Sequence, residues 1–209
     1  MSNLNLNVAS PTASLPFGSS PAMLGGKAGE GIVNELNGRY YTANYNGLVF
    51  TANVTAVTVP AIAATLVSVF SLYNPRNSGV NASLIDTDIT SVLATLVVNT
   101  FAWYFSADKN ADTATFTTKG TAQSGVLDGG PAGNKVQFYS ALTHVGTPVR
   151  WRIIGGHHAT TSTATGGIHR DWDGTAIVKP GTAISIAAST AVGTTSGLDL
   201  GVTWAEIPT

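Results

Sequence analysis

The segment TLVSVFSLYNPRNSGVNASLIDTDI, residues 65–89, sets the expectation for the whole chain. Its first part, Thr65–Tyr73, is apolar at both alternating positions, which is typical of a central strand buried on both faces. Residues 74–79 combine Asn, Pro, Ser and Gly, a composition that favours a turn. Val80–Ile89 then returns to β-type residues. The segment therefore predicts two strands joined as a hairpin by a loop of about six residues.

Apolar and polar residues alternate in four further segments, 48–56, 136–142, 149–153 and 198–204. This period of two indicates half-buried strands. No segment keeps a helical period, and helices do not alternate with strands, which argues against a parallel α/β sheet. We therefore expect an all-β protein, with an antiparallel β-sandwich of jelly-roll type over residues 31–209.

Residues 1–30 are expected to form an extended N-terminal arm. Three prolines and a cluster of glycines disfavour helix and weaken any regular element there. Apolar side chains that are unusual in a free tail suggest contact with a neighbouring subunit: Leu15, Phe17, Met23 and Leu24. A disordered tail is the alternative interpretation, and the sequence leaves both open.

Charge is scarce in this chain of 209 residues. Charged residues make up 10% and the net charge is −1, whereas roughly 25% is ordinary for a soluble domain. Such a balance argues against a nucleic-acid binder, which needs a basic surface. It predicts instead that much of the surface is covered by other protein, as in a homotrimer. Because cysteine is absent, disulfides, thiolate metal sites and a cysteine nucleophile are excluded.

Neither a signal peptide nor a membrane span is expected. The first 20 residues contain no Lys or Arg and no long apolar core. The run Ile89–Ala107 is uncharged over 19 residues, just long enough to span a bilayer. It is rich in β-branched and polar residues and is flanked by aspartates, which favours strands over a membrane helix.

One segment gathers residues that can bind metal ions: His157, His158, His169, Asp171 and Asp173. Imidazoles and carboxylates together can hold a divalent cation. However, adjacent histidines on a strand point to opposite faces, and the spacing matches neither the helical His-Glu-x-x-His pattern nor a complete calcium loop. We therefore favour a polar loop with turn residues, and expect no metal and no cofactor.

The remaining polar residues do not assemble a catalytic pattern. Asp86 and Asp88 share one face of a strand, about 7 Å apart, a separation conceivable for a catalytic pair, yet no third group is identifiable. Gly-x-Ser-x-Gly and the phosphate-loop motif are both missing. Arg150 and Arg152 are expected on one strand face beside Trp151, where a subunit contact is the better use. The sequence thus argues against an enzyme.

Several runs resemble small virion structural proteins of tailed bacteriophages, which decorate or cement capsids. The runs are GRYY at 38–41, GLVF at 47–50, SLYNPRNSGVNASLID at 71–86 and VTWAEIP at 202–208. The resemblance covers most of residues 30–208. It implies a β-sandwich or jelly-roll trimer on the outer surface of the capsid, assembled in the host cytoplasm and bound to the major capsid protein, with an arm that reaches neighbouring subunits.

A carbohydrate-binding or receptor-binding β-sandwich, such as a tail-associated adhesin, is the alternative function. In that case Trp103, Trp151 and Trp172 would stack on sugars. The position of these side chains separates the two functions. Burial between sheets or at a subunit contact favours a structural protein, and an open shallow face favours sugar binding.

Overall fold

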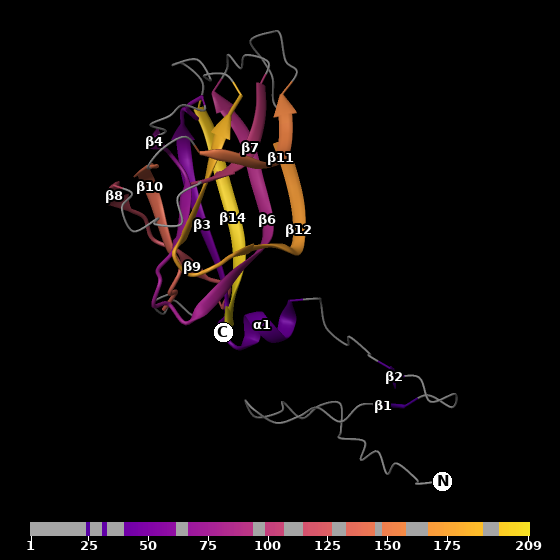
Figure 1. Ribbon diagram of the computed structural model, residues 1–209. Helices are drawn as coiled ribbons and strands as arrows, with labels where there is room; N and C mark the ends of the chain where they lie inside the picture. Colours follow the sequence, from indigo (N-terminus) through magenta and orange to yellow (C-terminus); the bar gives the residue numbers. More distant parts are fainter. Residues whose placement is uncertain are drawn as a thin grey trace. The chain divides into compact units, whose positions relative to one another are not determined.

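Antiparallel strands make up most of the structure (Figure 1). The chain divides into two units, residues 1–42 and 43–209. The computed structural model describes residues 24–25, 31–32, 40–61, 67–93, 99–106, 115–126, 133–144, 148–157, 167–189 and 197–209.

In the first unit, β1 (Leu24–Gly25) pairs with β2 (Gly31–Ile32) in antiparallel register. The helix α1 (Tyr41–Tyr45) follows along the chain. Of the apolar residues expected to contact a neighbour, Leu15, Phe17 and Met23 lie outside the described residues, and Leu24 begins β1. The extended arm over residues 1–30 therefore stays a prediction.

The second unit contains two antiparallel sheets. Sheet one has the order β12 (Gly167–Val178), β6 (Val80–Leu93), β14 (Gly197–Pro208), β3 (Val49–Val57) and β9 (Gln123–Ser124). Sheet two runs β11 (Val149–His157), β7 (Asn99–Phe105), β13 (Thr182–Ala188), β5 (Ser71–Asn74) and β10 (Gln137–Thr143). Two short strands also pair with β10, β4 (Val67–Ser68) and β8 (Thr115–Lys119).

Eight strands of the described part of the chain have a nested pairing order. β3 pairs with β14, β5 with β13, β6 with β12 and β7 with β11, so early strands pair with late ones. Figure 1 shows the result for sheet one, where the yellow β14 lies between β3 and β6. Strands distant in sequence therefore build both sheets.

One apolar core fills the space between the two sheets, which confirms the expected antiparallel β-sandwich. Sheet one contributes the alternating residues of β3 and β14, and sheet two contributes aromatic side chains. The largest fully buried side chains of this core are Trp103, Trp204, Phe70, Phe101, Leu72, Leu84, Ile89, Ile186, Leu198 and Leu200. Each such side chain contributes about 1.5–3 kcal/mol by leaving water.

The expected hairpin over residues 65–89 is wrong in its pairing. Only the end of the central strand expected over residues 65–73 is confirmed, since β5 has partners on both sides and all four of its residues are buried. Before it, β4 covers two residues, Val67 is 53% exposed, and residues 69–70 form a bend. However, β6 belongs to the other sheet, so the turn after Asn74 crosses between the layers. The buried Asn74 side chain holds this crossing, because its amide donates to the carbonyl oxygens of Val80 and Val178, both at 2.8 Å.

The uncharged run Ile89–Ala107 supplies strands. Residues 89–93 end β6, and β7 begins at Asn99. Within the described part of the chain, no helix has the length and apolar character needed to cross a membrane.

A buried carboxylate ties β14 to the segment before β10. Glu206 is 3% exposed. One carboxylate oxygen accepts the N–H of Val136 at 2.8 Å, and both oxygens accept the N–H of Lys135, at 2.9 and 3.0 Å. Lys135 and Val136 precede β10, and these bonds give their backbone N–H groups an acceptor outside the sheet.

Replacing Glu206 with Ala is expected to lower the free energy of unfolding by about 3 kcal/mol, because two backbone donors lose their acceptor. Urea unfolding measures the loss, and Glu206→Gln should lie between Ala and the wild type. Ile207→Ala, at a half-exposed neighbour on the same strand, serves as the control. A loss below about 1 kcal/mol for Glu206→Ala contradicts the assignment.

Candidate functional site

The pairing of β6 with β12 brings polar side chains together on the outer face of sheet one. Asp86 and Asp88 share this face, as the sequence predicted, while Thr87 between them is buried. The register places His169 opposite Asp88 and Asp171 opposite Asp86. In each of these two pairs, residues about 80 positions apart in the chain thus become direct neighbours across the antiparallel ladder.

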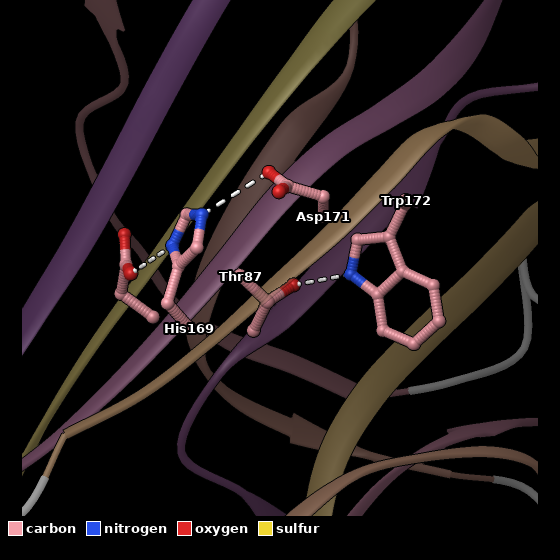
Figure 2. Close-up of polar contacts among 5 residues, drawn as sticks. Thr87, His169, Asp171 and Trp172 are labelled. Atoms are coloured by element: carbon pink, nitrogen blue, oxygen red, sulfur yellow. Dashed lines mark hydrogen bonds and ion pairs between the residues drawn. The ribbon is translucent and has the colours of Figure 1, made fainter.

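His169 lies between two carboxylates (Figure 2). Its Nδ1 is 2.6 Å from an Asp88 oxygen and its Nε2 is 3.1 Å from an Asp171 oxygen. An imidazolium donates from both nitrogens, so the charged form suits both neighbours. The hydrogen bond to Asp88 is the main cause that raises the pKa of His169. The cluster acts as a link between β6 and β12 at the surface.

Asp86 differs from the other carboxylates of this face. Partial burial raises the pKa of Asp86, and the nearby charges of Asp88 and Asp171 add to that shift. A hydrogen bond with Thr203 of β14 acts in the opposite direction. The ionised form of Asp86 is therefore disfavoured, because it is partly buried and repelled by the carboxylates of Asp88 and Asp171.

The five residues first considered as metal ligands are only partly brought together. His169 contacts Asp171 directly. Its second partner, Asp88, was not among the five, because its place beside His169 depends on the β6–β12 register. Asp173 has a φ of 51° and, with Gly174 at 74°, forms a bulge within β12. The His157 side chain and His158 lie outside the described residues. Among the described side chains, no group of three or more His, Asp or Glu is arranged to hold a metal ion.

The raised pKa of His169 gives a pH dependence with a defined sign. The stabilisation is fully present below the unfolded value near 6.5 and is lost as the pH rises through the folded-state pKa. We expect the imidazole of His169 to titrate above 6.5 in an NMR titration. Asp88→Asn should lower that pKa, because it removes the charged acceptor, whereas Asp199→Asn should change it less. Titration of wild-type His169 at or below 6.5 would contradict the cluster.

The other face of the same ladder carries a tryptophan between two arginines. Trp172 is 2% exposed, and its indole N–H donates to the hydroxyl of Thr87 at 2.9 Å (Figure 2). The guanidinium groups of Arg152 and Arg170 lie 5.8 and 5.6 Å from its ring centroid, within the range of cation–π attraction. Trp151 of β11 packs on it at 5.4 Å between centroids. These contacts connect the edges of the two sheets.

Strand β11 departs from the half-buried strand expected for residues 149–153. Val149, Trp151 and Ile153 are 43%, 41% and 48% exposed, and both arginines between them are exposed as well. A bulge at Trp151 also shifts the register, so that Arg150 pairs with Tyr104 and Arg152 with Trp103. The expectation that the two arginines share one face is therefore wrong, because the bulge breaks the period of two.

An apolar hollow of about 360 Å³ opens beside Trp151. Its lining comes from β6, β7, β11, β12 and β13 and includes Trp103, Phe105 and Ile184. Ile177, which also lines it, is 57% exposed. The edge formed by β11 and β12 thus leaves apolar surface in contact with solvent.

A second hollow, of about 280 Å³, lies on the outer face of sheet one. Asp88, Asp199 and Asn53 are among its lining residues, together with Gly201. A Cβ at Gly201 would lie 2.9 Å from the Asn53 side-chain oxygen, so a larger residue there would displace that side chain and narrow the hollow. Its lining can accept hydrogen bonds from a cationic or hydroxyl-bearing group.

The tryptophans do not form an exposed row. Trp103 and Trp204 are fully buried, and Trp172 is 2% exposed. Trp151 is the exposed one, at 41%. Of the three residues considered for sugar stacking, two are therefore inaccessible, and the third packs against its neighbour on the opposite sheet.

A buried histidine directly follows β10 and lies next to two serines of sheet two. His144 is 2% exposed, and its Nε2 is 2.6 Å from the hydroxyl of Ser185, which is 2.7 Å from the hydroxyl of Ser71. Burial lowers the pKa of His144 to about 4. The network therefore holds a neutral imidazole at neutral pH.

This lowered pKa predicts acid sensitivity. The contribution of a neutral His144 is present above the unfolded value near 6.5 and is lost as the pH falls toward the folded pKa of about 4. Full loss corresponds to about 3 kcal/mol. Urea unfolding at pH 7 and pH 4 should show a smaller pH dependence for His144→Gln than for the wild type. An equal pH dependence in the two proteins would show that other groups cause it.

Comparisons of the chain with protein-family models, curated proteins and solved structures found no match. Function is therefore inferred from the fold and from the surfaces described above.

Proposed function

We propose that the protein is a structural virion protein, a homotrimeric decoration or cement protein with a jelly-roll domain that stabilises a bacteriophage head. The nested strand order carries the proposal. Pairing of β3 with β14, β5 with β13, β6 with β12 and β7 with β11 is the order expected when a long antiparallel ribbon of eight strands is rolled into two sheets. This topology recurs in viral capsid domains.

The side-chain chemistry supports a structural role. The polar groups that meet across β6 and β12 link two strands, and the buried His144 network lies in the second sheet. Exposed apolar residues gather on the edge strand β11, where a subunit contact would bury them. The low charge of the chain, 10%, fits a surface that is covered in an assembly.

The N-terminal segment is the proposed attachment to the major capsid protein or to a neighbouring subunit. Residues 1–26 carry no charged side chain, so docking them against protein requires no charge to leave water. The prolines restrict the free chain and reduce the entropy lost on docking. Leu15, Phe17, Met23 and Leu24 are the proposed anchors.

A sugar-binding function is the weaker candidate. Jelly rolls also occur in lectins, and the outer hollow beside Asp88 and Asp199 offers polar groups. However, sugar-binding faces use exposed aromatic rings, and three of the four tryptophans are buried. The structural function therefore has the stronger support.

Mass measurement by light scattering tests the trimer. The full-length protein should have three times the 21.4 kDa mass of one chain. Deletion of residues 2–25 should leave the β-sandwich folded, with an unchanged circular dichroism spectrum, but should weaken binding to capsids. If the truncated protein binds capsids as tightly as the full-length protein, the proposed attachment through the arm is wrong. A stable monomer at high concentration would contradict the homotrimer.

A further inference from the structure

The edge of the sandwich formed by β11 and β12 has unusual chemistry. We define the aromatic–arginine edge as Val149, Arg150, Trp151, Arg152, Ile153 and Arg170. β11 pairs with β7, and β12 pairs with β6. In the described part of the chain, neither β11 nor β12 has a strand partner on its other side, so each is the edge strand of its sheet. Unpaired edges that carry exposed apolar residues promote association unless they are protected.

Charge on this edge restricts the partner. Arg150, Arg152 and Arg170 are all exposed, and none of them takes part in the ion pairs of the described part of the chain. Two copies that met edge to edge would place these arginines near one another, and like charges across an interface cost several kcal/mol. The edge therefore needs a partner surface that is negative.

The chain itself has such a surface. We define the acidic face as Asp86, Asp88, Asp171 and Asp199, on the outer side of β6, β12 and β14. The β6–β14 register places Thr90 opposite Asp199 and Asp88 opposite Gly201, so the four carboxylates lie on adjoining strands. Neither β6 nor β14 contains a Lys or Arg, and His169 of β12, which lies between Asp88 and Asp171, brings at most one positive charge to the four carboxylates. The Asp88–Asp199 hollow over Gly201, about 280 Å³, gives a planar guanidinium room beside carboxylates.

We propose that the aromatic–arginine edge of one copy docks on the acidic face of a second copy. The surfaces differ, so the contact is heterologous, and repetition by rotation closes it into a ring such as a trimer. This inference rests on the homo-oligomer of the proposed function and specifies its interface. Burial of Val149, Trp151 and Ile153 adds apolar contact to the arginine–carboxylate pairs, the combination found at the centre of stable interfaces.

Charge exchange within one chain tests the pairing. The double variant Arg150→Glu, Arg152→Glu should raise the dissociation constant of the oligomer about a hundredfold or more, measured by sedimentation equilibrium at low salt. Adding Asp171→Arg and Asp199→Arg to the same chain should restore much of the association, because the two introduced glutamates of the edge then meet two introduced arginines of the face. Lys119→Glu, Lys179→Glu, at exposed positions outside the edge and the face, makes the same change in net charge and should leave the oligomer intact.

The outcomes separate this inference from the proposed function. Thermal unfolding first shows that each variant is folded. If the wild type is an oligomer and the arginine variant keeps its full mass, the interface lies elsewhere and the inference fails while the homotrimer stands. Failure of the fourfold variant to recover also overturns the inference. A monomeric wild type overturns the homotrimer itself.

Discussion

The two hydrogen bonds donated by the Asn74 amide hold the point where the chain leaves one sheet and enters the other. They join the end of β5 to the start of β6 and the end of β12, at 2.8 Å each. The carbonyl of Asn74 also accepts the N–H of Gly181 at 2.7 Å, before β13 begins. Four strands from both layers therefore meet at one buried residue. Their nested pairing, and with it the core between the sheets, requires this crossing to be fixed.

Alternation of apolar and polar residues correctly predicted the strands that have the core on one face and solvent on the other. Phe50 and Ala52 on β3, and Leu198, Leu200, Val202 and Trp204 on β14, are buried as their period of two indicated. These strands lie inside a sheet, so one face meets the core and the other meets solvent. Residues 149–153 showed the same period but lie at an edge with a bulge, where the side chains face solvent in several directions.

Pairing could not be predicted in the same way. Turn residues at 74–79 mark a change of direction, but they do not specify whether the returning strand joins the same sheet. The link between His169 and Asp88 likewise depends on a register between strands far apart in the chain. The sequence supplied the polar residues of the outer face, and the fold decided which of them meet.

Strand β14 comes last among the strands and yet lies between β3 and β6 (Figure 1). During synthesis, sheet one therefore has no middle until residues 197–208 have left the ribosome. Contacts between the earliest and latest strands also give a high contact order, which slows folding. Until then any β3 and β6 that have formed lack their shared neighbour, and open strand edges with apolar side chains are the features that make incomplete chains prone to aggregation.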